Sequence, residues 1–189
     1  MPIPRLCPAS TTLLVIDVQE RLMPTIAAAP RVEANCAILA QAAGVLGIPV
    51  ICSEQYVRGL GHTVPPVREA LPPGALVVEK TRFSALTDEV RAALQSSGRP
   101  NVLICGVEAH VCVLQTALDL LGSGWRVFHA TDAISSGQRD QVEPAFRRIE
   151  AAGAVPTGTL GAMYELVRDA SHPTFRHLLA LAKLVPKNG

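Results

Sequence analysis

The stretch NVLICGVEAHVCVLQTALDLL, residues 101–121, decides the fold class of this chain. Residues 102–105 form an apolar run of strand length, Gly106 provides a turn, and residues 112–121 carry apolar side chains at helical spacing. This is the order of a βα unit. Because the unpaired N–H groups at a helix N-terminus carry partial positive charge, they favour a thiolate there. We therefore expect Cys112 to be nucleophilic.

The same alternation of apolar runs and helix-like segments continues along the whole chain. Strands are expected at residues 11–16, 48–53, 76–79, 102–105, 125–130 and 154–157, and helices at 32–46, 87–96, 112–121, 141–151, 163–169 and 175–184. Strands that are apolar on both faces and alternate with helices favour a parallel sheet covered on both sides. We predict a single domain over residues 1–189, a three-layer α/β/α, Rossmann-like fold with a six-stranded, mainly parallel sheet.

One segment interrupts this alternation. Residues 54–73 are rich in Pro and Gly and have no sustained period, so we predict a long loop with a single helical turn near Val67. Loops of this length in compact domains are usually functional.

Composition and charge exclude several classes of partner. The 189 residues include 17 basic and 16 acidic side chains without runs of either sign, and the net charge is +1. This balance offers no attraction for nucleic acid or for an anionic membrane surface. No apolar stretch reaches the roughly 18 residues that a membrane span needs. We expect the partners to be small molecules and further copies of this chain.

The cysteines and the N-terminal segment indicate a reducing compartment. The five cysteines form an odd set without a C-x-x-C pair, so we expect free thiols rather than disulfides or a zinc ribbon. Cys36, Cys52 and Cys105 lie in apolar segments and are interpreted as small buried hydrophobic residues. The segment MPIPR lacks the charged and apolar regions of a signal peptide. A cytoplasmic protein is the resulting expectation.

Three reactive side chains are expected to meet at one edge of the sheet. Asp17 ends the first expected strand, Lys80 ends the third, and Cys112 follows the fourth. Ligands of open parallel sheets bind at the carboxyl ends of the strands. Taken singly, each residue also has a structural explanation, as a helix cap, a solvated charge and a packing residue. Together they have the composition of an activated nucleophile.

These residues carry a resemblance to a known family. The chain resembles the isochorismatase-like cysteine hydrolases, the superfamily that includes nicotinamidases and N-carbamoylsarcosine amidohydrolases. The matching motifs are LLVIDVQERL around Asp17, VVEKTRFSAL around Lys80 and ICGVEAHVCVLQTALDL around Cys112, and the resemblance covers nearly the whole chain. A finer match, in EQYVRGLGHTVPPV and SHPTFRHLLALAK, is to the isochorismatase domain-containing branch.

The resemblance implies an isochorismatase-like hydrolase fold and a role for each motif residue. Cys112 would attack a carbonyl or similar carbon, Asp17 would be the general base, and Lys80 would support both electrostatically. A non-proline cis peptide is implied at Val107-Glu108, in the turn before the cysteine. The backbone amides of Glu108 and Cys112 would then form an oxyanion hole.

The chain also departs from the family pattern. Nicotinamidases carry an Asp-x-His metal site after the second strand, where this chain has the sequence SEQY, residues 53–56. His62 is interpreted as a lone loop histidine, so we expect no catalytic metal and no cofactor. The family motif usually has a small residue at the position of Glu108, although the matched branch carries Glu. Because Glu108 is placed by its backbone, its side chain need not enter the site.

Several residues near the motifs are candidates for substrate binding. Gln19 follows Asp17 by two positions, and it either orients the substrate or a neighbour or makes a structural hydrogen bond. Tyr56, Leu60 and Phe83 are candidates for an apolar pocket wall, with core packing as the alternative.

The sequence therefore favours a hydrolase that cleaves a C–N amide bond of a small molecule through a thioester on Cys112. The alternative is a catalytically silent ligand-binding or interaction module on the same fold. A dinucleotide-binding oxidoreductase would need G-x-G-x-x-G after the first strand, where the sequence is DVQERLMP. Relatives commonly form homo-oligomers, and a content of only 17% charged residues is compatible with a buried subunit interface.

Overall fold

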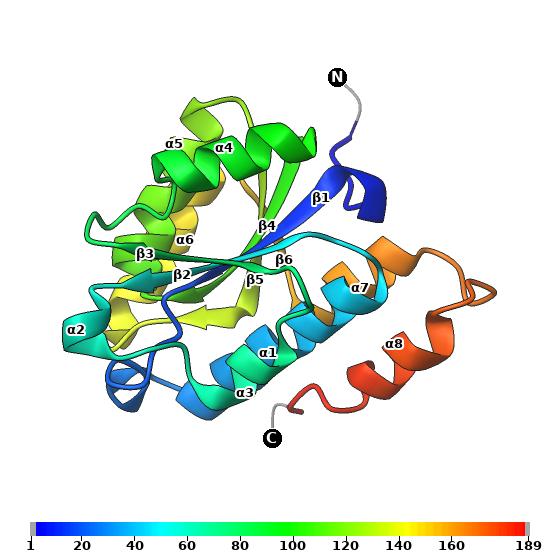
Figure 1. The fold of residues 1–189 in the computed structure, drawn as a ribbon, viewed down its shortest axis with the longest axis horizontal. Coiled ribbons are helices and arrows are strands. Elements are labelled where there is room, and N and C mark those ends of the chain that lie inside the picture. The colour runs from blue at the N-terminus through cyan, green and yellow to red at the C-terminus, as the bar shows by residue number, and fades with distance from the viewer. Residues whose placement is uncertain (1–2, 188–189) are drawn as a thin grey trace.

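In the computed structural model, residues 3–187 are described, and they form a six-stranded sheet between two layers of helices (Figure 1). The strands are β1 (Thr11–Ile16), β2 (Val50–Gln55), β3 (Leu76–Lys80), β4 (Asn101–Val107), β5 (Arg126–Ser135) and β6 (Val155–Thr157). Their order in the sheet is β3-β2-β1-β4-β5-β6, and every neighbouring pair is parallel. The predicted fold class is confirmed, with a sheet that is parallel throughout.

The helices divide between the two faces of the sheet, as Figure 1 shows. One face is covered by α1 (Ala29–Val45), α3 (Pro65–Ala70), α7 (Thr159–Val167) and α8 (Phe175–Ala182), and the other by α4 (Asp88–Ser97), α5 (Leu114–Gly122) and α6 (Val142–Ala151). Side chains of a strand alternate between faces. Accordingly, Leu13 and Val15 of β1 belong to the core beneath α1, whereas Leu14 and Ile16 belong to the core beneath α5.

The remaining helical segments are short. They comprise α2 (Val57–Leu60), three 3₁₀ turns, Pro8–Ser10, Met23–Thr25 and Arg139–Gln141, and the π-helical segment Ala109–Val113 before α5. Among the residues described, no helix combines the length and the apolar character that crossing a bilayer requires.

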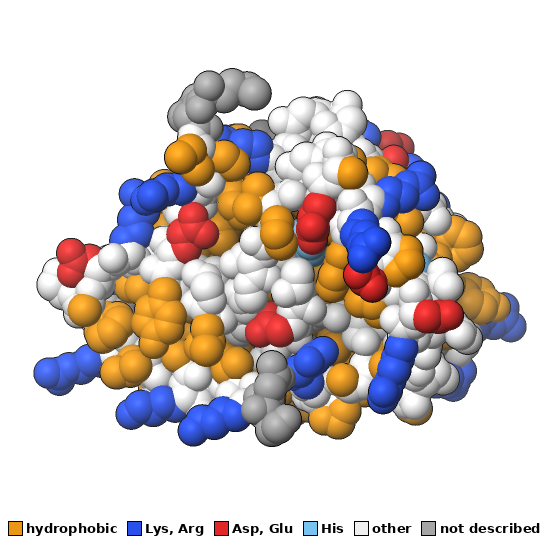
Figure 2. Space-filling model, turned by 180° about the vertical axis from the view of Figure 1, so that it is seen from behind, with side chains coloured by type: hydrophobic (Ala, Val, Ile, Leu, Met, Phe, Trp, Pro, Cys, Tyr) orange, Lys and Arg blue, Asp and Glu red, His pale blue; other side chains and the backbone are white. Residues whose placement is uncertain are grey.

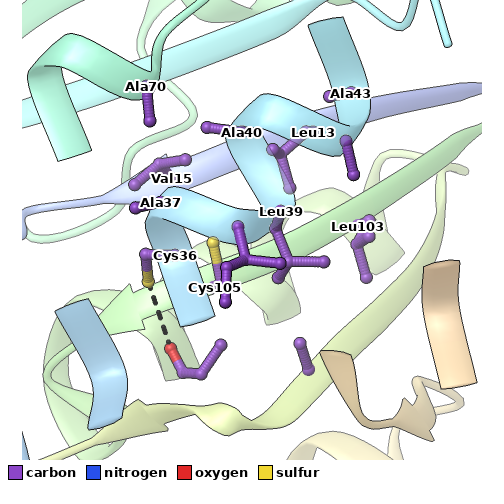
Figure 3. Close-up of a cluster of buried hydrophobic side chains, with 14 of the residues drawn as sticks. Leu13, Val15, Cys36, Ala37, Leu39, Ala40, Ala43, Ala70, Leu103 and Cys105 are labelled. Carbon is purple, nitrogen blue, oxygen red and sulfur yellow. Dashed lines mark hydrogen bonds between the residues drawn. The ribbon is translucent and has the colours of Figure 1, made fainter. Parts of the chain in front are cut away.

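Buried thiols form part of the larger core. Figure 3 shows Cys36 of α1 beside Cys105 of β4, among Leu39 and Leu103. The Cys36 thiol donates a hydrogen bond to the backbone carbonyl of Ala133, at 3.5 Å. All five cysteines lie within the described residues and are free, and those at 36, 52 and 105 are completely buried, as the sequence predicted.

Some element boundaries differ from the prediction for physical reasons. The segment 54–73 contains two helices, α2 and α3, rather than one turn, because Pro65 and Pro66 preset the backbone dihedral at the first positions of α3. Helix α7 begins four residues before its predicted start. Its first N–H, of Thr159, donates to the Asp132 carboxylate at 2.7 Å, so the cap comes from a distant strand. Thr87 caps α4, since its Oγ1 accepts from the amide of Val90.

Candidate active site

The order of the strands brings the three motif residues to one edge of the sheet. From β1 the chain proceeds to β2 and β3 on one side, and from β4 to β5 and β6 on the other, so β1 and β4 form the topological switch point. Crevices at such points, beyond the carboxyl ends of the strands, are the usual ligand sites of open parallel sheets. Asp17 follows β1, Lys80 ends β3, and Cys112 lies in the π-helical segment after β4.

The three side chains are in contact in the interior of the protein. The Nζ atom of Lys80 lies 2.7 Å from Oδ2 of Asp17 and 3.7 Å from Sγ of Cys112. The side chains of Asp17 and Lys80 have no exposed surface, and Cys112 is 6% exposed. A buried ion pair is a poor way to stabilise a fold, because desolvation offsets much of its attraction. Its presence beside a thiol is therefore a reason to look for a chemical role.

Lys80 is held by acceptors on several sides. Besides Asp17, its ammonium group donates to Oε1 of Gln55 at 3.2 Å and to the backbone carbonyls of Phe83 at 3.0 Å and Arg82 at 3.3 Å. An ammonium group has only hydrogen-bond donors. Its surroundings match that chemistry, and they fix the positive charge between the carboxylate and the thiol.

The position of Asp17 is also fixed, by its backbone conformation and by hydrogen bonds. Its backbone has a φ of 54°, a left-handed conformation that few residues other than Gly adopt. The Asp17 amide donates to the carbonyl of Ser53 at 3.1 Å, and the Ser53 hydroxyl donates to Oδ1 of Asp17 at 2.7 Å. Burial raises the pKa of Asp17 above its ordinary value of 3.8, and Lys80 opposes that rise. Asp17 is thus a carboxylate with increased affinity for a proton.

Gly106 allows β1 and β4 to approach closely at this point. Its φ is +117°, and a Cβ atom there would lie 2.0 Å from the carbonyl oxygen of Ile16. No larger residue fits without moving the backbone of β1. The glycine therefore keeps Asp17 next to the turn that leads to Cys112.

The turn after β4 holds the cysteine in an irregular first helical turn. The peptide bond between Val107 and Glu108 is cis. The carbonyl of Glu108 then accepts hydrogen bonds from the amides of Val111 and Val113, both at 3.1 Å, on either side of Cys112. The helix begins at Ala109 rather than at the predicted residue 112, because the π-helical segment extends it.

The protonation state of Cys112 differs from the prediction. Burial, and next the charge of Asp17, raise the pKa of Cys112 from 9.0 to about 12, although Lys80 acts in the opposite direction. The expectation of a resting thiolate is therefore wrong. Cys112 favours the protonated thiol, and the ion pair of Asp17 and Lys80 lies beside it.

Glu108 and His110 anchor this turn to the segment after β5. Oε1 of Glu108 accepts from the amide of Gly137 at 2.9 Å, and Nδ1 of His110 lies 3.0 Å from the hydroxyl oxygen of Ser136. The carboxylate of Glu108 is thereby engaged away from the thiol. Within residues 3–187, the backbone N–H of Glu108 has no hydrogen-bond acceptor. That N–H is available to a ligand.

The candidate substrate-binding residues separate into two groups. Gln19 is completely buried, and its side-chain amide bonds the backbone of Gln55 and the carbonyl of Gly61, so it holds the loop after β2. Tyr56 and Phe83 are about half exposed beside Lys80. Tyr56 lines a cavity of about 440 Å³, whose wall is completed by Val57, Arg58, Glu79, Lys80, Thr81, Arg82 and Thr87.

The sequence of this chain matches known proteins. Residues 11–160 match the family described as Isochorismatase domain. The chain belongs to the isochorismatase family. Isochorismatase domain-containing protein 2 of Danio rerio is 40% identical over 179 residues, which are 94% of this chain and 89% of that protein. The predicted family is thus confirmed, and its hydrolase-type fold is that of this chain.

Solved structures of isochorismatase-like proteins superpose closely on this one. The structure of MAR1 ribonuclease from Caenorhabditis elegans has a TM-score of 0.94 and 37% identity, and the match covers 98% of this chain and 96% of that one. YcaC from Pseudomonas aeruginosa, solved with hexane-2,5-diol and covalent acrylamide, has a TM-score of 0.88 and 26% identity, with 98% and 97% covered.

Two residues around the isochorismatase-like triad were not predicted from the sequence. Ser53 and Gln55 lie two positions apart on β2, so they point to the same face, and they contact Asp17 and Lys80 respectively. The signal was present, since two polar residues at the end of an otherwise apolar strand point to a site. Their partners could be assigned only once β2 was known to lie between β1 and β3.

The region of the nicotinamidase metal site has another arrangement in this chain. His62 is an exposed loop histidine, as predicted, and in addition its Nδ1 lies 2.9 Å from Oε2 of the buried Glu54. Glu54 also accepts from the amide and the hydroxyl of Thr63, both at 2.7 Å. In the part of the chain that the structure describes, no group of three or more His, Cys, Asp and Glu residues is arranged to hold a metal ion.

Proposed function

We propose that this protein is a cysteine hydrolase that cleaves a C–N amide bond of a small molecule, with Cys112 as the nucleophile. One observation carries the proposal. The buried ammonium group of Lys80 contacts both the carboxylate of Asp17 and the thiol of Cys112. The contact supplies a base, a cation and a nucleophile within one water-poor site.

In the first half of the reaction, Sγ of Cys112 attacks the substrate carbonyl while Asp17 accepts the thiol proton. The carbonyl oxygen becomes an oxyanion, which the backbone N–H groups of Glu108 and Cys112 stabilise. A single donor of this kind contributes roughly 3 to 4 kcal/mol to acyl transfer. Asp17 then returns the proton to the nitrogen, the C–N bond breaks, and an amine and a thioester are formed.

In the second half, water attacks the thioester and Asp17 accepts a proton from that water. The S–C bond breaks, the released thiolate of Cys112 takes the proton back from Asp17, and a carboxylic acid leaves. Lys80 remains protonated throughout and compensates the negative charge that moves between the carboxylate and the sulfur. A base with a raised pKa suits this role, because efficient proton transfer requires affinities near the working pH.

The accessibility of the site favours a small substrate. Cys112 is almost completely buried, and Tyr56 and Phe83 stand partly exposed beside Lys80 as candidate walls. The relative from Pseudomonas aeruginosa carries covalent acrylamide, which is itself a small amide. That observation is compatible with a reactive residue and a small pocket in this branch of the family.

Ribonuclease activity is a second candidate, because the related nematode structure is named a ribonuclease. The surface gives it little support. Figure 2 shows acidic and basic side chains mixed over the visible face, with apolar patches between them. The net charge of the whole chain is only +1. Sequence-independent binding to RNA depends on neutralising successive phosphates, for which a basic surface is needed.

Self-association and a reducing location complete the proposal. The edge strand β3 exposes Val77, and Tyr56 and Phe83 are exposed near its end, with exposed fractions of 48%, 54% and 52%. Exposed apolar groups at a sheet edge support burial against another copy of the chain. Five free thiols support a cytoplasmic location. Sedimentation velocity of the chain would test the assembly.

The proposed activity can be tested with a library of small primary and secondary amides. Wild type should release amine and show a transient acyl adduct on Cys112 by intact mass spectrometry, whereas Cys112→Ser and Asp17→Asn variants should not. A structured RNA and a single-stranded RNA form the second arm. Cleavage of RNA that depends on Cys112 would replace the amidase proposal. A wild type that binds library members without turnover would support the silent binding module.

A further inference from the structure

A second cavity, which shares no lining residue with the triad, lies beneath the C-terminal segment. It measures about 320 Å³ and is bounded by α1, β5, the start of α7 and the segment after α8. Its polar lining consists of Arg31, Asn35, Asp132, Lys183 and Lys187. The proposed hydrolase mechanism uses none of these residues.

Two lining residues carry polar atoms that lack a partner. Over residues 3–187, five buried side-chain nitrogen or oxygen atoms have no hydrogen bond, and two of them are Nε of Arg31 and Oδ1 of Asn35. These residues are four positions apart in α1, so they lie on the same face of that helix. Buried polar atoms of folded proteins are normally paired. A donor and an acceptor left together in one cavity indicate a ligand.

The orientation of Asn35 is fixed by the fold. Asn35 is 1% exposed, and its Nδ2 donates to the backbone carbonyl of Asp132 at 2.8 Å. This bond leaves Oδ1 as a free acceptor. The Asp132 carboxylate is already engaged, because its Oδ1 accepts from both the amide and the hydroxyl of Thr159. Asp132 therefore positions the cavity wall and caps α7.

The charge of the lining residues indicates the charge of the ligand. Arg31, Lys183 and Lys187 are basic and only Asp132 is acidic, so the lining is positive. An anionic group would satisfy Nε of Arg31 and the lysines, while a hydroxyl group would donate to Oδ1 of Asn35. We propose that this cavity binds a small hydroxylated anion. Either a hydroxycarboxylate or a phosphorylated polyol has this chemistry.

Isothermal titration calorimetry of the full chain at low salt tests the proposal, with malate and glycerol 3-phosphate as the two probes. Succinate and inorganic phosphate are their counterparts without the hydroxyl group. At least one probe should bind at least about tenfold more tightly than its counterpart. Arg31→Met should weaken that binding by at least tenfold. The matched variant Arg58→Met, which removes the same charge from the cavity beside Lys80, should leave it unchanged.

Two further variants keep the test decisive. Asn35→Leu should equalise a probe and its counterpart, and circular dichroism will show whether this buried change is tolerated. Lys183 is exposed, so Lys183→Met will fold and should weaken binding several-fold. The proposal is overturned if neither probe binds, which would mean a cavity filled by water only. It is also overturned if Arg58→Met, and not Arg31→Met, removes the binding.

Discussion

Cys52 and Cys112 are both buried cysteines, and their surroundings differ in one respect that decides their chemistry. Burial raises the pKa of each thiol to about 12. Cys52 has the hydroxyl of Thr63 as its polar neighbour, at 3.4 Å. Cys112 has the ammonium group of Lys80 at 3.7 Å, and Asp17 bonded to that ammonium. In the proposed mechanism, the adjacent base rather than the thiol pKa therefore distinguishes Cys112 from Cys52.

The two regions also differ in what they contribute to stability. The core around Cys36, Cys52 and Cys105 is apolar, and its burial favours folding (Figure 3). The site around Cys112 instead buries an ion pair that apolar residues could replace at little cost. Variants of the two cysteines should therefore separate activity from stability, whereas removal of one partner of the ion pair should affect both.

The largest expected effect is that of Cys112→Ala. Covalent catalysis cannot proceed without the sulfur, so amide hydrolysis should fall by roughly a thousandfold or more, and iodoacetamide labelling at this position should disappear. The free energy of unfolding should fall by only about 1 kcal/mol, because the change leaves a small cavity. Progress curves and chemical denaturation measure the two quantities. Retained hydrolysis would remove Cys112 from the mechanism.

Asp17→Asn should be nearly as damaging to the reaction. Loss of a general base typically costs a factor of about 10² to 10⁴, and the measurement is the rate of amide hydrolysis at pH 7. The buried charge of Lys80 also loses its partner, which should lower the free energy of unfolding by about 3 to 5 kcal/mol. The control is Asp140→Asn, an exposed position. Equal rates of hydrolysis in the two variants would contradict the assigned role of Asp17.

Ser53→Ala should have an intermediate effect. The Ser53 hydroxyl donates to the Asp17 carboxylate and so lowers the pKa of Asp17. Without it that pKa rises further, and because the base must be ionised, the acid limb of the rate should move to higher pH. A hydrogen bond to a charged group contributes about 1.5 to 3 kcal/mol to the stability of a protein. A pH–rate profile that superposes on wild type would show that Ser53 only fills space.

Cys52→Ala should have the smallest effect on the reaction. No base contacts this thiol, so hydrolysis and the labelling of Cys112 should remain within twofold of wild type. The small cavity left behind should lower the free energy of unfolding by roughly 1 kcal/mol. Thermal unfolding with parallel activity assays provides the measurement. A loss of activity comparable to that of Cys112→Ala would erase the contrast between the two cysteines.

The sequence predicted most of the fold because its signals are local. Every strand except β5 ends within two residues of the predicted position, whereas β5 continues five residues further, to Ser135. Asp17 and Lys80 could be placed at strand ends by apolar runs alone. Features that depend on distant partners were missed. The start of α7 depends on Asp132 of β5, and the pairing of His62 depends on Glu54. Neither contact leaves a periodic pattern in the chain.

The state of the candidate site could be predicted only in part. The motifs brought Asp17, Lys80 and Cys112 together, but a local argument from the helix N-terminus gave the wrong protonation state for the thiol. Burial and the Asp17 charge outweigh that local effect, and both arise from the packing of separate elements. Gln19 was left open between two roles, and its hydrogen bonds to Gln55 and Gly61 make it structural.

The pH dependence of Cys112 alkylation by iodoacetamide, in wild type and in Asp17→Asn, tests the central claim most directly. If Asp17 takes the thiol proton, the wild-type rate should rise once as Asp17 ionises, above its ordinary pKa of 3.8, and then stay level through neutral pH. In Asp17→Asn the rate should instead rise about tenfold per pH unit, as for an unassisted thiol. Tenfold-per-unit profiles of equal height in both proteins would contradict the account.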